Sequence, residues 1–319
     1  MSSFCARLES ARLVTDLIEC LIEEKRNEVV AHIAIDAAGV ELHVVGRSKS
    51  THATLTLPVS CFSAFDCVDE SGAPFVSGGD QEPIAFSVDV RALVECLKLF
   101  GAGGADPEVS LSYTPETEVF KLTLEEPGAF TACDVHVLED CDDLDGAVDM
   151  AGAFRDAPTI AKTLTTSATL RDVVQDFDDS SIGLSSIKVS VSRLAPYFRL
   201  AASGSVGCVQ IDVPRDAFVL FEAPDDKRSW TYQTQAFLHG MKALPHSSET
   251  YVRVNDHGML LVQHMVANDL GNAENLYLEY ICCSECDDHL PEYPPSQPAA
   301  AADQQQPAPD FATLASPAF

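Results

Sequence analysis

The sequence predicts an α+β fold in which two similar domains each combine antiparallel sheets with two helices on one face. The first observation is a long internal repeat, because residues 10–13 read Ser-Ala-Arg-Leu and residues 167–170 read Ser-Ala-Thr-Leu. Each phrase opens an apolar helical pattern and is followed by alternating strands that close at a glycine, Gly46 or Gly204. The separations of 157 and 158 residues agree, as expected for two copies of one domain.

The second observation is a unit of one strand, one helix and several strands that occurs four times. Alternating apolar residues predict the strands, and apolar residues three and four positions apart predict the helices. In the first half the predicted order is strand 4–8, helix 10–24, strands 29–36, 40–46 and 53–57, strand 84–88, helix 89–100, and strands 109–113, 119–124 and 130–137. In the second half it is strand 160–164, helix 167–177, strands 187–191, 197–202 and 206–213, strand 230–234, helix 235–244, and strands 251–255, 260–266 and 276–282.

Composition divides the chain into two domains, a connector and a tail. The two domains are predicted at residues 1–137 and 159–286, a usual length for single domains. Residues 138–158 are rich in Asp, Gly and Ala and show no period, so we expect an exposed connector with little fixed structure. Residues 287–319 are rich in Pro, Ala and Gln, a composition typical of disorder.

Composition and charge argue against several classes of protein. The apolar fraction of 46% is typical of a globular core, and no run of about 18 uncharged apolar residues predicts a membrane span. Residues 1–10 do not read as a signal peptide, so the eleven cysteines are expected to be reduced, in the cytosol or nucleus. The net charge of −29 is concentrated in residues 134–156 (−7) and 285–319 (−6), so it says less about the folded surfaces.

Four strings of the sequence are similar to one known family. Residues 89–101, Asp-Val-Arg-Ala-Leu-Val-Glu-Cys-Leu-Lys-Leu-Phe-Gly, resemble the second helix of Rad1-type subunits of the DNA-damage checkpoint clamp, a PCNA-like ring often called the nine-one-one clamp. Residues 196–200 (Pro-Tyr-Phe-Arg-Leu), 258–265 and 279–283 resemble strands of the same subunits, in the same order. The likeness extends over about residues 4–286. It implies a PCNA-like clamp fold with the two helices of each domain on the inner face of a ring.

The resemblance also implies partners and a role. Two unlike clamp subunits would complete a heterotrimeric ring around duplex DNA, and an ATP-driven clamp loader would open it. Checkpoint and repair proteins would be recruited in the nucleus, and neither a cofactor nor a metal is expected. Subunits would pair through edge strands near 129–137 and 205–213, where the candidate interface residues are Phe130, Ala132, Asp134, Val206, Cys208 and Gln210.

The polar faces of the predicted helices supply the candidate DNA contacts. In helix 89–100, an apolar stripe is opposed by Arg91, Glu95 and Lys98 at helical spacing, and the other helices divide in a similar way. The candidate DNA-facing residues are Arg12, Arg91, Lys98, Arg171, His239 and Lys242. The same pattern is typical of any solvated helix face, and helix 10–24 carries Asp16, Glu19 and Glu23 where a DNA-facing helix is expected to be basic. Only the resemblance therefore favours DNA contact.

The acidic connector is a candidate docking segment for partner peptides. Its negative charge repels phosphate, so we expect it to serve proteins rather than DNA. The residues proposed for this role are Leu138, Asp143, Leu144, Val148 and Met150.

Candidate metal and catalytic motifs are weak. Cys282, Cys283, Cys286 and His289 have spacing that zinc could use, but neighbouring strand residues point in opposite directions and a second Cys-x-x-Cys pair is absent from the sequence. Residues 141–152 resemble a calcium loop that lacks its final glutamate. A phosphate-binding loop and a nucleophile elbow are also absent. A non-enzymatic clamp subunit is therefore the main prediction, with a metal-dependent 3′–5′ exonuclease and a homotrimeric replication clamp as alternatives.

Overall fold

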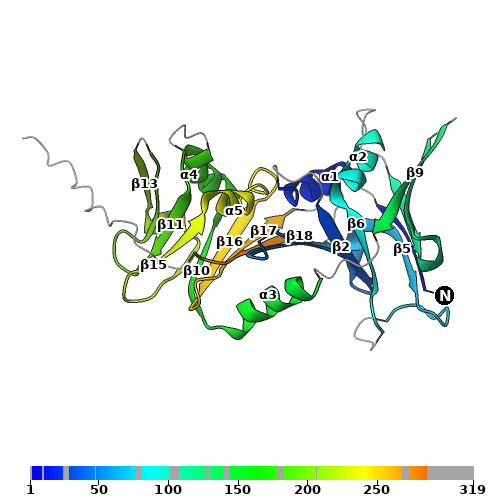
Figure 1. Cartoon of the computed structure of the whole chain (residues 1–319), viewed down its shortest axis with the longest axis horizontal. Coiled ribbons are helices and arrows are strands. Elements are labelled where there is room, and N and C mark those ends of the chain that lie inside the picture. Colours follow the sequence, from blue (N-terminus) through cyan, green and yellow to red (C-terminus); the bar gives the residue numbers. More distant parts are fainter. Residues whose placement is uncertain are drawn as a thin grey trace, which may run out of the picture. The chain divides into compact units, whose positions relative to one another are not determined.

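Strands and helices occur in the same order twice along the chain (Figure 1). The computed structural model describes residues 2–8, 11–23, 29–46, 48–76, 81–100, 108–126, 129–138, 144–178, 183–205, 207–267 and 274–285. The first half contains β1 (Ser3–Leu8), α1 (Ala11–Cys20), β2 (Val30–Asp36), β3 (Gly39–Val45), β4 (Thr51–Pro58), β5 (Phe62–Val68), β6 (Ile84–Asp89), α2 (Val90–Phe100), β7 (Val109–Thr114), β8 (Val119–Glu126) and β9 (Ala129–Leu138).

After helix α3 (Leu144–Asp156), the second half repeats this order. It contains β10 (Thr159–Thr166), α4 (Ser167–Asp178), β11 (Ser186–Val191), β12 (Phe198–Ser203), β13 (Cys208–Val213), β14 (Leu220–Glu222), β15 (Arg228–Gln233), α5 (Thr234–His239), β16 (Glu249–Asn255), β17 (Leu260–Val266) and β18 (Leu276–Cys282). A short 3₁₀ turn follows β4 at Val59–Cys61 (η1), and its counterpart follows β13 at Arg215–Ala217 (η4). Each element of the first half thus has a counterpart in the second.

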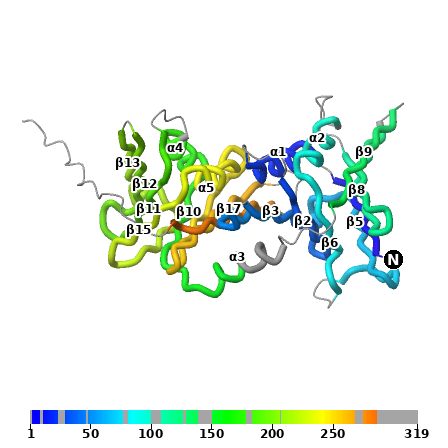
Figure 2. The backbone as a smooth tube through the Cα atoms, in the orientation of Figure 1, coloured from blue at the N-terminus to red at the C-terminus, as the bar shows by residue number. Residues whose placement is uncertain are grey.

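The halves share one long antiparallel sheet. Its strand order is β14-β10-β16-β17-β18-β4-β3-β2-β6-β9-β8-β7-β1-β5, and a separate sheet has the order β13-β12-β11-β15. The junction between the halves is the pairing of β4 with β18, in which Thr56 lies opposite Tyr277. Residues Met1–Cys286 form one compact unit. In Figure 2, β17 of the second half and β3 of the first half lie near the middle of this sheet.

Four helices cover one side of the sheets (Figure 1). Their apolar stripes enter the main core, since α1 buries Leu17 and Ile18, α2 buries Leu93, and α4 buries Val174 and Phe177. Burial of each such side chain stabilises the fold by about 1.5–3 kcal/mol. Helix α3 lies on the opposite side (Figure 1). None of the helices in the described ranges is long and apolar enough to cross a membrane.

Three predictions about local structure were wrong. Residues 144–156 form a helix, because Met150 and Phe154 stand four positions apart and pack into an apolar cluster with Met259, Leu261 and Ile281. The helix predicted at 235–244 ends at His239 and continues as turns. Strands β5 and β14 were missed, and in β5 a bulge opposite Leu8 interrupts the expected alternation.

Candidate nucleic-acid interface and subunit edges

The carboxyl end of α1 is held by side chains from α2 and from the segment around α5. Lys242 donates from Nζ to the carbonyl oxygen of Ile22 (3.0 Å), and Nε2 of His239 donates to that of Cys20 (2.9 Å). Arg91 donates from Nη2 to the carbonyl oxygen of Glu23 (3.3 Å). The carbonyl of Cys20 ends α1, and those of Ile22 and Glu23 follow it, so the three donors lie at the negative end of the helix dipole.

Four of the six candidate DNA-facing residues therefore contact α1 or the residues just after it. The fourth contact is the ion pair of Lys98 with Glu19, which balances part of the acidic face of that helix. Helix α1 belongs to the first half, and His239 and Lys242 belong to the second, so two of the contacts also join the halves. The sequence placed Lys242 on the helix predicted at 235–244, but α5 ends at His239, so Lys242 follows it. Contact of these side chains with DNA remains a prediction.

The other two candidates, Arg171 and Arg12, are exposed, as is Lys98. Arg171 points away from the core on α4, on the face that also carries Asp172, Gln175 and Asp176. Arg12 is exposed in the first turn of α1. The exposed side of the helices is therefore mixed in charge rather than uniformly basic.

Of the two predicted interface strands, β13 is an edge strand and β9 is one over most of its length. Residues 129–136 of β9 pair with β8, whereas only Val137 and Leu138 pair with β6. Strand β13 pairs with β12 and ends its sheet. The predicted interface residues on β9 are exposed, with Phe130 64% accessible, as is Cys208 on β13, whereas Gln210 is half-buried. Val206 lies outside the described residues.

The internal repeat relates these edges to the junction inside the chain. Strand β13 occupies the place of β4 in the repeat, and β9 occupies the place of β18. Strands β4 and β18 pair with each other, whereas β13 and most of β9 leave one backbone edge open among the described strands. Open edges of this length favour pairing with another chain.

The candidate connector residues have mixed surroundings. Leu138 is exposed, whereas Met150 is 7% accessible in the cluster beneath α3. Arg253 lies over the ring of Phe154, with its guanidinium carbon 5.7 Å from the ring centre. Leu144 and Val148 belong to α3, but their side chains and all of Asp143 lie outside the described residues. The expectation of an exposed connector with little structure is therefore wrong for its second half.

The cysteine cluster is described only in part. Cys282 is buried and Cys283 is half-buried, and burial raises the pKa of the Cys282 thiol to about 12. Cys286 and His289 lie outside the described residues. In the described part of the chain, no three His, Cys, Asp or Glu side chains are grouped so as to hold a metal ion.

Two buried histidines should make the fold sensitive to acid. Burial lowers the pKa of His52 and of His264 from 6.5 to about 4. The unfolded chain takes up these protons first as the pH falls, so the free energy of unfolding should drop between about pH 6.5 and pH 4, by ~2–3 kcal/mol per histidine. Urea unfolding at several pH values in this range should show that the free energy of unfolding of His52→Gln depends less steeply on pH than that of the wild type, by about one proton. An unchanged slope would mean that His52 titrates normally in the folded chain.

Comparison with known proteins identifies the family. The family model described as "Repair protein Rad1/Rec1/Rad17" matches residues 3–266. The chain belongs to this family. It is 28% identical to the human "Cell cycle checkpoint protein RAD1" over 217 residues, which cover 66% of this chain and 72% of the relative. It is 24% identical over 261 residues to the "DNA damage checkpoint control protein rad1" of Schizosaccharomyces pombe, covering 75% of each chain.

Membership of the Rad1 family confirms the main prediction from sequence. The fold is the PCNA-like clamp fold, and the chain is a Rad1-type subunit of the DNA-damage checkpoint clamp. Such a subunit works together with other clamp subunits. The exonuclease and the homotrimeric replication clamp are not favoured.

Proposed function

We propose that this Rad1-type chain is a non-enzymatic member of a ring of three unlike subunits that encircles duplex DNA in the nucleus. An ATP-driven loader would open the ring, and the closed ring would recruit checkpoint and repair proteins. In this proposal residues 1–137 and 159–286 act as two clamp domains, each presenting two helices to the DNA.

One observation carries the proposal. The junction of β4 with β18 inside the chain is a template for the junctions between subunits, since β13 and β9 are its counterparts and have open edges. A neighbour's β9-like strand would lie along β13, and a neighbour's β13-like strand would lie along β9. Such head-to-tail contacts close into a ring when the rotation per domain permits it.

The helices would line the hole of the ring and would add a modest positive charge to its surface. Arg12, Arg171 and Lys98 are exposed and would reach phosphates directly, whereas Arg91, His239 and Lys242 would contribute mainly by offsetting the negative end of α1. Loose, screened contacts of this kind allow a ring to slide. Much of the DNA binding would then fall to the other subunits.

The connector would serve partner peptides on the opposite side. Leu138, Asp143, Leu144 and Val148 are the residues proposed to meet a partner. Met150 would instead anchor α3 to the sheet through its buried contacts.

The mass of the isolated chain tests the proposal. We expect a monomer in light scattering, and a 1:1:1 complex when the chain is co-expressed with two other clamp subunits of its own organism. A stable homotrimer of the chain alone would contradict the heterotrimeric ring.

Removing two of the exposed cations should weaken DNA retention. Arg12→Ala with Arg171→Ala should leave ring assembly intact and flatten the dependence of log K on log salt by about one unit for each lost phosphate contact. The assay is retention of the assembled ring on closed circular DNA across a salt series. Lys121→Ala, which removes an exposed lysine from β8, is the control. Equal retention by the double variant and the wild type would place both arginines away from DNA.

A further inference from the structure

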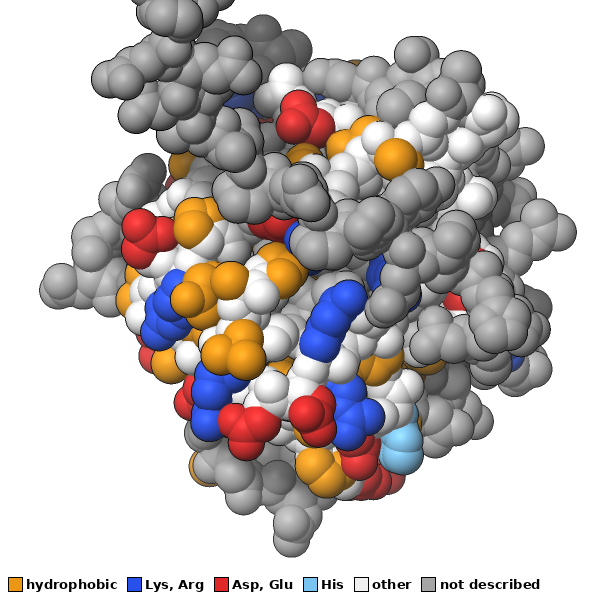
Figure 3. Space-filling model, turned by 90° about the vertical axis from the view of Figure 1, so that its left-hand side faces the viewer, with side chains coloured by type: hydrophobic (Ala, Val, Ile, Leu, Met, Phe, Trp, Pro, Cys, Tyr) orange, Lys and Arg blue, Asp and Glu red, His pale blue; other side chains and the backbone are white. Residues whose placement is uncertain are grey.

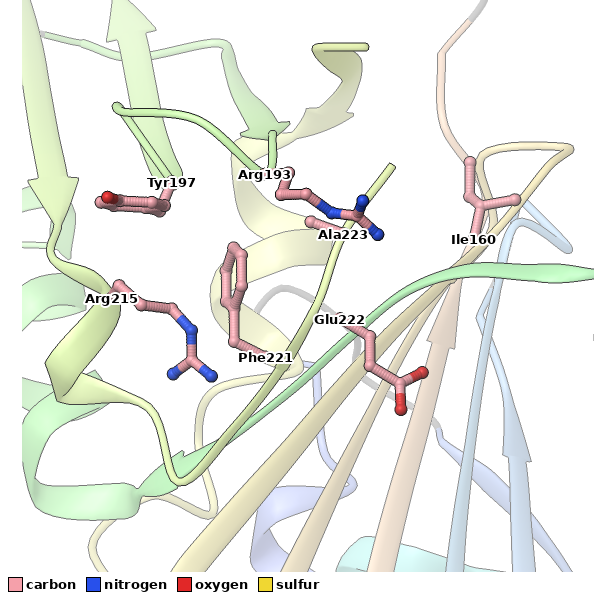
Figure 4. A pocket seen from close by; sticks show the side chains of 7 residues that line it. All are labelled: Ile160, Arg193, Tyr197, Arg215, Phe221, Glu222 and Ala223. Carbon is pink, nitrogen blue, oxygen red and sulfur yellow. The ribbon is translucent and has the colours of Figure 1, made fainter. Parts of the chain in front are cut away.

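A pocket of about 550 Å³ opens in the second half, where the β11–β12 turn meets η4 and β14 (Figure 4). Its walls include Ile160, Arg193, Tyr197, Arg215, Phe221 and Glu222. None of these residues belongs to the helical face or to the edges of β9 and β13. The pocket is therefore a separate feature of the subunit.

Aromatic rings and guanidinium groups meet in this pocket. The rings of Tyr197 and Phe221 are perpendicular, with centres 6.1 Å apart, and Arg215 lies 5.2 Å from the centre of Phe221. Figure 4 shows the Phe221 ring between the side chains of Arg193 and Arg215. Arg215 also donates to the carbonyl oxygen of Phe218 (3.2 Å), which fixes its direction. Such a site can hold an apolar group and an anion side by side.

Exposed apolar side chains lie close in sequence to residues that line the pocket. Leu194 is 71% accessible, Val219 is 68% accessible and Leu220 is 36% accessible. Strand β14, which carries Leu220, pairs only with β10 and forms one end of the long sheet. An apolar rim beside an open strand edge is typical of surfaces that bind extended peptides.

The charge of this region differs from that of the whole chain. Residues 186–233 contain six basic and five acidic residues, a net charge of +1 in a chain of −29. Figure 3 shows this end of the molecule, where Lys and Arg side chains lie among hydrophobic and acidic ones. Arg193 is paired with Asp225 at 2.5 Å, but both side chains are more than half accessible, so another carboxylate can compete for this arginine.

We propose that the pocket and the edge of β14 bind an extended acidic peptide of a partner protein that carries one aromatic residue. The aromatic residue would pack against Tyr197 and Phe221, and flanking carboxylates would pair with Arg215 and Arg193. Backbone pairing along β14 would fix the direction of the peptide. An open strand edge pairs with the N–H and C=O groups of a peptide, which a nucleic-acid backbone lacks, so the occupant proposed here is a peptide.

Fluorescence anisotropy with defined peptides tests the proposal. The probe is a fluorescein-labelled peptide with the core Asp-Glu-Phe-Asp-Glu, and its two altered forms replace Phe by Ala or all acids by their amides. The protein is the full chain, as wild type and as the variants Arg215→Ala and Tyr197→Ala. Arg228→Ala is the matched control, because Arg228 is exposed in the same region but does not line the pocket.

We expect the probe to bind and each altered peptide to bind at least about tenfold more weakly. Arg215→Ala should raise Kd about tenfold, as loss of a charge-assisted contact does, and Arg228→Ala should leave it unchanged. Arg215 is exposed, so its variant should remain folded even if Tyr197→Ala does not. Absence of binding, or an equal loss in Arg228→Ala, overturns the proposal. Binding to the isolated chain that disappears in the assembled ring also overturns it, since the pocket would then belong to a subunit contact.

Discussion

Proline on the open edge of β9 is expected to prevent ring assembly without unfolding the chain. Thr131 and Ala132 are adjacent, so one N–H points toward β8 and the other toward the open edge. Proline at the outward position removes a hydrogen-bond donor and places its pyrrolidine side chain where the neighbouring subunit's strand would lie. Co-purification with the two other clamp subunits should be lost, while the melting temperature of the isolated chain stays within a few degrees of wild type.

Thr131→Pro and Ala132→Pro are made as a pair, and the variant whose proline faces β8 is the control for the other. At the inward position proline breaks the β8–β9 ladder, so that variant should melt at a clearly lower temperature. If the variant with normal stability still co-purifies as a 1:1:1 complex, β9 is not a subunit edge.

Replacing Lys242 by methionine is expected to lower the free energy of unfolding by about 2 kcal/mol. The substitution keeps an unbranched apolar stem but removes the ammonium group that donates to the carbonyl of Ile22. A hydrogen bond to a charged group contributes about 1.5–3 kcal/mol, and a cation at the carboxyl end of a helix adds some tenths of a kcal/mol. Urea unfolding of the isolated chain measures the change without DNA or partners.

Arg171→Met is the matched comparison for this effect. It also removes a cation that the sequence assigned to the DNA face, but Arg171 is exposed, so a change within about 0.5 kcal/mol is expected. Equal losses of stability in the two variants would show that Lys242 does not hold α1 in solution.

Local patterns in the sequence were sufficient for most of the fold. The predicted strands 260–266 and 276–282 agree with β17 and β18 at both ends, and the helix predicted at 167–177 differs from α4 by one residue. The repeat of Ser-Ala-Arg-Leu at 10–13 by Ser-Ala-Thr-Leu at 167–170 marks the starts of equivalent helices. These features depend on periodicity within a few turns, which a single sequence displays.

The contacts of the candidate site depend on distant residues and were not predictable in this way. Nothing near Lys242 in the sequence indicates that the end of α1 lies beside it, since that contact follows from the pairing of β4 with β18. Helix α3 was hidden by a composition of Asp, Gly and Ala. The spacing of Met150 and Phe154 was its one visible signal.

The junction of β4 with β18 also determines when the chain can finish folding. Thr56 and Tyr277 pair across more than 200 residues of sequence, so during synthesis β4 must wait for β18, the last described strand. Until then the backbone N–H and C=O groups along one edge of β4 have no partner strand. A chain that stops before Leu276 keeps this edge and is prone to aggregate, so the edge is concealed only once residues 276–282 have been made.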